Sequence, residues 1–341
     1  MLVSRGCLIS EISFNPKNNN IADQDFTLFT YSREAILAIL RSHHICMDDE
    51  VIVPDYLCST VIDCILPFTN KIIFYNINHY LKHDESEITG LLSSKTRMIF
   101  FVDYFGVETR VGPILQDLLA VKRILIVKDA SHSFLSLVNR DFSSDCKYDY
   151  LISSVYKNLP LQAGAIGIGN FELCDDFVSL SVVLRRTLVL LVKNIICVLG
   201  FGRLLSSRMC DVTIADEEKI LHSKGINVSG IYKKFLSRIN LEEIVRNRRK
   251  VTDKFNKFFS GKSGLRPLFF IEDINENILQ DYPIYVENQE YRDRLMKILA
   301  KNSIDAYTWP TFHSMNHSEH LWSKILVLPL NQKVIEVLKI V

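Results

Sequence analysis

The chain has 341 residues, of which 48% are hydrophobic, so it can bury a large core as one sizeable domain with a smaller companion or as two comparable domains. Its 40 lysines and arginines nearly balance its 39 aspartates and glutamates, which gives a formal net charge of +1. This balance excludes the strongly basic surface of a nucleic-acid-binding protein and favours small-molecule or protein partners.

Eight cysteines are present, but none stands in a CxxC pair or in a zinc-type spacing with histidine. We therefore expect no metal site, and reduced thiols of the kind found in the cytoplasm. Polar residues interrupt the first twenty positions, which lack the continuous apolar core of a signal peptide. The sequence predicts a protein that stays in the cytoplasm.

From about residue 26 to residue 170, short apolar runs alternate with helical patterns. Apolar spacing predicts a first helix over residues 33–44, with Ser32 as its N-cap. The expected strands are 50–54, 71–77, 97–106 and 123–129, and the expected helices between them are 60–66, 87–93 and 112–121. This alternation favours an α/β fold with a mainly parallel central sheet and helices on both faces.

The segment 178–208 is strongly apolar but is interrupted by Arg185, Arg186 and Lys193. A membrane-spanning helix needs roughly 18 or more apolar residues with few charges, which this segment does not supply. A helix that is apolar on most faces can be buried in a subunit interface, and basic residues at its ends would also let it lie on an anionic membrane surface. We favour the interface and keep peripheral membrane contact as the alternative.

The last hundred residues have a different character. A charged helix is expected over 240–260, followed by a strand, a helix and two further extended segments; these are 282–288, 291–304, 306–313 and 324–330. The pattern predicts a smaller α+β domain. We therefore expect a large domain over residues 1–239 and a small domain over residues 240–341.

Chemistry-bearing side chains follow the ends of several predicted strands. They are Tyr56, Asp129, His132, Ser154 and Lys157. Sites in open parallel sheets lie beyond the carboxyl ends of the strands, so these residues are expected at one edge of the sheet. A lysine held there can form a Schiff base with a cofactor aldehyde in a partly desolvated pocket.

Pyridoxal phosphate (PLP) would make two further demands, and the sequence can meet both. Its ring nitrogen needs a carboxylate, which Asp129 supplies at the end of a buried strand, while His132 could bond to the cofactor or stack near its ring. Its phosphate needs hydroxyls and the free N–H groups of a helix N-terminus. Candidates for that role are Ser32, Arg33 and Glu34, which open the first long helix, and Ser154.

Each of these residues also has an ordinary structural interpretation. An aspartate at the end of a strand is commonly a turn former, a serine such as Ser32 caps helices in any protein, and a lysine in a loop is usually solvated. A lone histidine is more often structural than catalytic. The order of all four along the chain, each at a strand end or a helix start, favours a shared site.

Four stretches carry a resemblance to a known family: "VIVPDYLCSTVIDCILPFTNKIIFYNI", "KTRMIFFVDYFG", "VKDASHSF" and "SSVYKNLP". Their content and order resemble the DegT/DnrJ/EryC1/StrS family, the PLP-dependent sugar aminotransferases of fold type I. The resemblance extends over residues 31–169. It resumes at "RNRRKVTDKFNKFF" and at "YPIYVENQEYRDRLMKILAKNSIDAYTWP", which are similar to the small domain of the family.

The resemblance implies a role for each candidate. Lys157 would form the Schiff base with PLP and move the proton between cofactor and substrate carbons, Asp129 would hold the pyridine nitrogen, and His132 would take the family's Gln-or-His position near the ring. The cofactor-binding set would comprise Ser32, Arg33, Glu34, Tyr56, Asp129, His132, Ser154 and Lys157. The family works as homodimers whose sites are completed by the partner subunit.

Two departures from the family pattern concern the phosphate. The first phosphate loop commonly carries Gly-Thr or Gly-Ser, whereas this chain has "YSREA" at residues 31–35. A serine commonly stands five residues before the lysine, whereas this chain has Ile152 there. Either Ser154 substitutes for that serine or the loop is built differently. Both changes indicate a divergent member.

The resemblance implies an aminotransferase that moves an amino group from an amino acid such as glutamate to a keto group of a nucleotide-linked sugar, for surface polysaccharide or a related product. The altered loops motivate an alternative of another class. In that alternative the protein is a non-catalytic relative that acts as a binding or assembly module, at the membrane through residues 178–208.

Overall fold

The structure is a computed structural model. It describes residue 13, residues 25–29, 31–140, 147–159, 164–172, residue 234, and residues 236–262, 264–310 and 319–339. The apolar segment 178–208 lies outside these ranges, so its two interpretations stay predictions.

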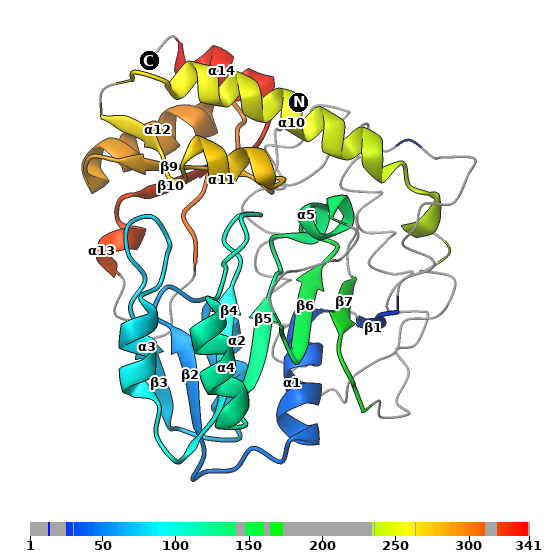
Figure 1. The fold of residues 1–341 in the computed structure, drawn as a ribbon. Coiled ribbons are helices and arrows are strands. Elements are labelled where there is room, and N and C mark those ends of the chain that lie inside the picture. Colours follow the sequence, from blue (N-terminus) through cyan, green and yellow to red (C-terminus); the bar gives the residue numbers. More distant parts are fainter. Residues whose placement is uncertain are drawn as a thin grey trace.

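The larger part of the molecule is built on a seven-stranded sheet with the strand order β1-β7-β6-β5-β4-β2-β3 (Figure 1). The strands from β3 to β6 pair in parallel, while β7 pairs antiparallel with β6 and with β1. The bounds are β1 Thr27–Phe29, β2 Glu50–Pro54, β3 Ile72–Tyr75, β4 Thr96–Val102, β5 Leu125–Asp129, β6 Tyr150–Ser154 and β7 Ala165–Ile168. The predicted α/β fold with a mainly parallel sheet is confirmed.

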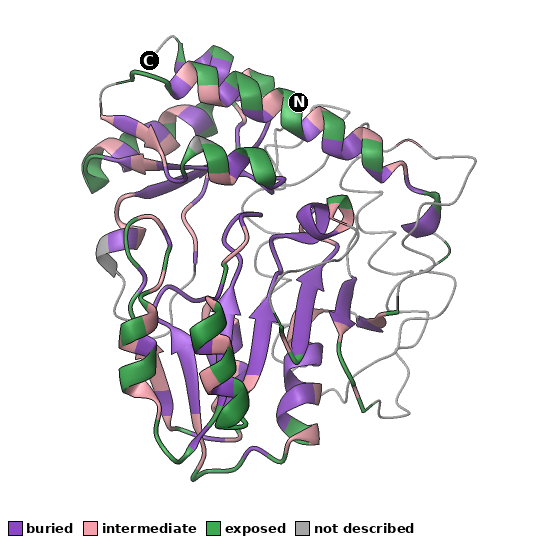
Figure 2. Cartoon of the chain, viewed as in Figure 1, coloured by how far each residue is buried: buried purple, intermediate pink, exposed green. Residues whose placement is uncertain are grey.

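Five helices of the described ranges accompany this sheet. They are α1 Ser32–Ser42, α2 Ser59–Ile65, α3 Glu85–Leu91, α4 Pro113–Val121 and α5 Phe134–Asn139. Helices α3 and α4 lie in front of the sheet in Figure 1, and α1 packs against α2, β6 and β7. The central strands are almost wholly buried, whereas α3 and α4 expose their outer faces (Figure 2). Burial on both faces explains why these strands are continuous apolar runs in the sequence.

The smaller part is a three-stranded antiparallel sheet in the order β10-β9-β8, covered by helices. Its elements are α10 Leu241–Phe259, β8 Leu265–Pro267, α11 Ile271–Glu276, β9 Tyr282–Val286, α12 Gln289–Lys301, α13 Glu319–Trp322, β10 Ile325–Leu328 and α14 Gln332–Leu338. Helix α10 runs along the top of both parts in Figure 1, with α14 packed against it. We call residues 240–341 the small domain, and the boundary with residues 1–239 stays a prediction. The carboxyl ends of the parallel strands face this small domain.

Two of the differences from the predicted element boundaries bear on the site. Strand β4 ends at Val102 and not at Gly106, because Phe105 and Gly106 both have positive φ angles, of 56° and 103°. Such angles are incompatible with an extended strand. Helix α1 begins at Ser32 with Tyr31 as its N-cap, so Ser32 is the first helical residue and not the cap.

Within the residues that the structure describes, no helix combines the length and the apolar character needed to cross a bilayer.

Candidate active site

The ends of β5 and β6 lie side by side and place two predicted residues at one edge of the sheet. Asp129 is the last residue of β5 and pairs in register with Ile152 of β6. Beyond this pair, the Ala130 N–H donates to the Ile152 carbonyl at 2.7 Å, and the Ser153 hydroxyl donates to the Ala130 carbonyl at 2.8 Å. These bonds fix the segment after Asp129 against the strand that leads to Lys157.

Lys157 lies in a single helical turn that follows β6. The Leu159 N–H donates to the Val155 carbonyl at 2.9 Å, and the buried Asn158 amide donates back to the Ser154 carbonyl at 3.2 Å. Lys157 itself is half-buried. Its ammonium group makes no hydrogen bond or ion pair within the described part of the chain. The turn therefore holds a lysine amine that is available for chemistry.

Asp129 is 8% exposed, and its Oδ1 accepts a hydrogen bond from the Ser131 N–H at 3.0 Å. Its neighbour Lys128 does not pair with it, because Lys128 Nζ lies 2.6 Å from Asp103 Oδ1. Among the residues that the structure describes, Asp129 forms no ion pair. A buried carboxylate is costly without a positively charged or hydrogen-bonding partner, so this position suits a protonated ring nitrogen.

Three serine hydroxyls meet at the N-terminus of α1. Ser32 Oγ lies 2.5 Å from Ser154 Oγ and 3.1 Å from Ser131 Oγ, and Ser32 is the first residue of the helix. A helix N-terminus offers unpaired N–H groups and a partial positive charge, and hydroxyls add donors for an anion. Ser154 thus stands beside the helix even though Ile152 replaces the usual serine. Ser154 stands three residues before Lys157 and not five, and its hydroxyl still lies at this site.

Arg33 and Glu34 serve this helix end in different ways. The Tyr31 N–H donates to Glu34 Oε2 at 3.4 Å, and the Glu34 N–H donates to the Tyr31 carbonyl at 3.1 Å. The carboxylate of Glu34 therefore caps the helix, and a negative group there does not favour a phosphate. Arg33 lies over the Tyr31 ring at 4.8 Å, and its buried Nε has no hydrogen-bond partner among the described residues.

His132 is buried behind this edge, 4% exposed. The Phe105 N–H donates to its Nδ1 at 3.3 Å. Burial lowers the pKa of His132 well below its usual value of 6.5, and the positive charge of Lys157 lowers that pKa further. The imidazole is therefore neutral at physiological pH, and its position near Lys157 agrees with the predicted site.

Tyr56 is fully buried after β2, and its hydroxyl donates to the carbonyl of Trp309. The Trp309 ring lies 5.4 Å from the Tyr56 ring and 4.8 Å from the His132 ring. Sequence reasoning missed Trp309, Ser131 and Phe105 as parts of this site. Only the family-like stretch "AYTWP" pointed toward Trp309, because nothing in the spacing of the sequence relates residue 309 to residue 132.

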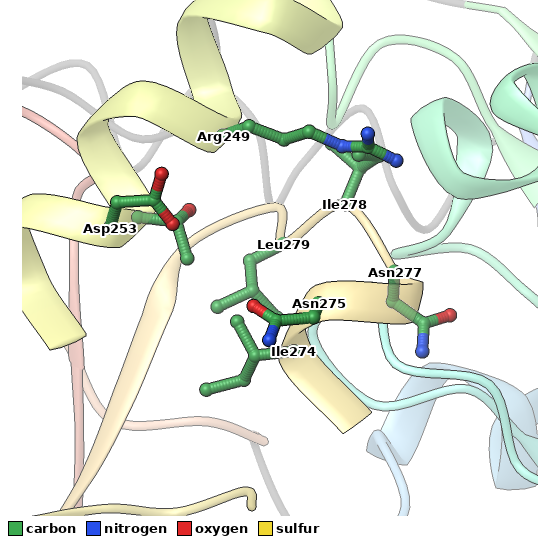
Figure 3. A pocket seen from close by; sticks show the side chains of 8 residues that line it. Arg249, Asp253, Ile274, Asn275, Asn277, Ile278 and Leu279 are labelled. Atoms are coloured by element: carbon green, nitrogen blue, oxygen red, sulfur yellow. The ribbon is translucent and has the colours of Figure 1, made fainter. Parts of the chain in front are cut away.

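A cavity of about 200 Å³ lies elsewhere, between α10 and the α11–β9 segment (Figure 3). Its lining residues are Arg249, Thr252, Asp253, Ile274, Asn275, Asn277, Ile278 and Leu279. None of the predicted site residues lines it. We place the candidate active site at the strand ends, where the reactive groups converge, and not in this cavity.

The donor set at the strand ends fits PLP. Asp129 offers a buried carboxylate without an ion pair among the described residues, and Ser32, Ser131 and Ser154 gather hydroxyls at a helix N-terminus. Lys157 offers an amine without a partner in the described chain. Each chemical group of the cofactor therefore has a matching group in the protein.

Comparison with solved structures agrees with this fold. Spr1654 from Streptococcus pneumoniae, assigned as a sugar aminotransferase, matches in its PMP form with a TM-score of 0.65 and 16% identity, over 98% of this chain and 95% of that chain. The aminotransferase TlmJ from Streptoalloteichus hindustanus matches with a TM-score of 0.64 and 13% identity, over 99% of this chain and 96% of that chain. PseC from Helicobacter pylori is an aminotransferase involved in the biosynthesis of pseudoaminic acid. It matches with a TM-score of 0.59 and 14% identity, over 99% of this chain and 98% of that chain.

Spr1654 also matches in its PLP form, with a TM-score of 0.61 and 16% identity. No curated protein sequence matches the chain. The model of the DegT/DnrJ/EryC1/StrS aminotransferase family matches residues 29–141, a range that includes α1, Tyr56, Asp129 and His132. This match covers about a third of the chain and agrees with the predicted family and enzyme class over that part.

Proposed function

We propose that the protein is a PLP-dependent aminotransferase that moves an amino group from an amino acid, with glutamate as donor, to a keto group of a nucleotide-linked sugar. The observation that carries this proposal is the convergence at one sheet edge of Lys157, whose amine has no partner among the described residues, with the buried carboxylate of Asp129. Structural lysines and aspartates are usually exposed or paired with each other, whereas Asp129 is buried and neither residue forms an ion pair within the described part of the chain.

When bound, the cofactor supplies an aldehyde for a lysine amine and a ring that accepts electrons. Lys157 would bind it covalently through Nζ and then carry the proton between the two reacting carbons. Asp129 would keep the ring nitrogen protonated, which maintains the electron-accepting form. The hydroxyls of Ser32, Ser131 and Ser154, with the N-terminus of α1, would hold the phosphate and fix the position of the ring.

The sugar substrate is supported by the family and by the fold. PseC acts in the biosynthesis of pseudoaminic acid, and Spr1654 is assigned as a sugar aminotransferase. We extend this class to the present chain and expect a nucleotide-linked keto sugar used for surface polysaccharide or a related product. A homodimer in the cytoplasm is part of the same proposal.

The cofactor assignment is tested by absorption spectroscopy. Purified protein mixed with PLP should show the near-visible band of a lysine-bound cofactor, and glutamate should convert this band to the shorter-wavelength band of the aminated cofactor. Lys157→Ala should lose the near-visible band, whereas Lys147→Ala should keep it because Lys147 is an exposed surface lysine. Wild-type protein that takes up no PLP would contradict the assignment and favour the non-catalytic alternative.

The substrate class is tested once the cofactor has been aminated. Single-turnover reactions with a panel of nucleotide-linked keto sugars should return the near-visible band for one class, and mass spectrometry should show the amino sugar. Free keto sugars and simple keto acids serve as controls. Reaction with keto acids alone would remove the nucleotide-linked sugar from the proposal while leaving the aminotransferase assignment intact.

A further inference from the structure

The loop after β4 contains a turn with an unusual backbone. The Val107 N–H donates to the Tyr104 carbonyl at 2.9 Å, and the two residues between them, Phe105 and Gly106, have φ angles of 56° and 103°. Positive φ is uncommon for a bulky residue, and a left-handed backbone costs roughly 1–2 kcal/mol for any residue other than glycine. Such a conformation persists only where the surrounding structure imposes it.

Phe105 connects the small domain to His132 by two hydrogen bonds. Its N–H donates to His132 Nδ1 at 3.3 Å, and its carbonyl accepts from the Gln280 N–H at 2.8 Å. Gln280 lies between α11 and β9, so it belongs to the small domain. Because a backbone N–H can only donate, Nδ1 must be the unprotonated nitrogen of the imidazole.

The next residue allows the close approach of the two domains. A Cβ at Gly106 would overlap the carbonyl oxygen of Ile278 in the small domain. The hydroxyl of the buried Ser136 donates to the Gly106 carbonyl at 2.7 Å and accepts from the Ile278 N–H at 2.7 Å. The turn is therefore held between α5 and the segment before β9.

The small domain also reaches the ring of His132 directly. The imidazole lies between the Phe105 ring, 5.5 Å away at an interplanar angle of 25°, and the Trp309 ring, 4.8 Å away at 69°. Trp309 also lies 5.6 Å from Phe105 and accepts the hydroxyl of Tyr56 at its carbonyl. These contacts leave the imidazole little freedom to rotate or to exchange its two nitrogens.

We propose that the small domain sets the tautomer and the ring orientation of His132, through Phe105 and Trp309, so that Nε2–H is the donor offered to the cofactor. Phe105 and Trp309 act as positioning residues, since they act through His132. The cofactor as recipient rests on the proposed function. The tautomer itself does not, because it is a property of the protein without cofactor.

The charge state of His132 agrees with this arrangement. Burial and the nearby Lys157 keep the pKa of His132 well below its usual value, so the ring stays neutral and carries one proton. A neutral imidazole has one donor and one acceptor nitrogen, and the Phe105 N–H occupies the acceptor. In a histidine, the hydrogen bond made by one ring nitrogen determines whether the other ring nitrogen carries the proton.

The proposal is tested on the apoprotein by ¹⁵N NMR of the imidazole nitrogens. Among the nine histidines, the His132 signals are assigned by their loss in His132→Gln. Wild-type protein should show the Nε2–H tautomer with no protonation between pH 5 and pH 8. Trp309→Leu should give a mixture of tautomers or a protonation step in that range. Trp322→Leu should change neither, because that tryptophan packs against Arg292 in another part of the small domain.

A second measurement keeps the test decisive if Trp309→Leu folds poorly. The conservative Trp309→Phe should retain the Nε2–H tautomer, and Trp309→Leu should lose affinity for PLP relative to wild type and Trp309→Phe. An Nδ1–H tautomer in wild type would overturn the proposal, as would unchanged His132 signals in a folded Trp309→Leu. If wild-type protein showed the Nε2–H tautomer of His132 but did not bind PLP, the result would count against the proposed function and not against this proposal.

Discussion

At the scale of single residues, the site depends on ionisable groups that have no ion-pair partner among the described residues. Lys157 and Asp129 face the same sheet edge, and neither forms an ion pair among the described residues. His132 is buried and neutral between two aromatic rings. Keeping these groups in place costs stability in the apoprotein, since each prefers water or a countercharge.

The buried His132 predicts a specific loss of stability in acid. Its pKa is lowered in the folded protein, so below pH 6.5 the unfolded chain binds a proton that the folded chain does not. The free energy of unfolding should therefore fall with decreasing pH, by up to about 1.4 kcal/mol for each pH unit below 6.5. Urea denaturation of wild type and His132→Gln at pH 7 and pH 5 should show a smaller loss in the variant.

His83 supplies the internal comparison for this experiment. Burial lowers its pKa as well, so His83→Gln should also reduce the loss of stability in acid, but without any change in cofactor affinity. Equal acid sensitivity in wild type and His132→Gln would show that His132 is accessible to protons in the folded state.

At the scale of elements, the loop from Asp103 to Thr109 links the sheet, the site and the small domain. Below the turn, Lys128 and Asp103 form an ion pair of 2.6 Å in which both side chains are 1% exposed. Lys128 also donates to the Thr109 carbonyl, and the Thr109 N–H donates to Asp103 Oδ1 at 2.7 Å. The pair thus closes the base of the loop that carries Phe105.

This pair predicts an asymmetric response to substitution. Lys128→Met leaves the Asp103 carboxylate buried without a countercharge, so the free energy of unfolding should fall by about 3–5 kcal/mol. The double variant Lys128→Met, Asp103→Leu should recover part of this loss, because it removes the isolated charge. Chemical denaturation measures both.

The exposed pair Lys71 and Asp48, 2.9 Å apart, is the matched control. Lys71→Met should change stability little, since solvent screens a surface pair. If Lys71→Met and Lys128→Met lowered the free energy of unfolding equally, the ion pair of Lys128 and Asp103 would have to be accessible to solvent.

At the scale of the whole molecule, two sheets meet where the parallel strands end (Figure 1). At this junction a Cβ on Gly106 would overlap the carbonyl oxygen of Ile278, so the two backbones lie too close for any side chain at position 106. Arg248 of α10, which is 4% exposed, donates to the Gln280 carbonyl and so ties the long helix to the same segment. The junction therefore transmits the position of the small domain to the turn beside His132.

Two glycine substitutions separate this contact from a general effect on the chain. Gly106→Ala forces a left-handed alanine against Ile278, so the free energy of unfolding should fall by at least about 1–2 kcal/mol. Gly90→Ala in α3 meets nothing within 4 Å and should stabilise the protein by up to about 1 kcal/mol. Thermal denaturation followed by circular dichroism distinguishes them, and a Gly106→Ala variant as stable as wild type would disprove the close contact.

The sequence by itself predicted the α/β class, the resemblance to the family and the ends of strands β5 and β6. Short apolar runs such as "EVIVP" and "RILIVKD" predict buried strands, and their alternation with helices favours a parallel sheet. Asp129, Ser154 and Lys157 could be placed at one edge because parallel strands end together. Each of these predictions depends on residues that are close together in the sequence, so the sequence alone is enough to make it.

Only the tertiary structure decided which of these residues meet and what holds them. The contact of Ser32 with Ser154 spans 122 positions, and that of His132 with Trp309 spans a domain boundary, so no periodicity reveals them. The capping role of Glu34 and the left-handed Phe105 likewise depend on what packs around them. Burial of the core brings together side chains that are far apart in the sequence. The free energy of burial depends on the packing of the whole core, so no local sequence pattern indicates which two side chains will meet.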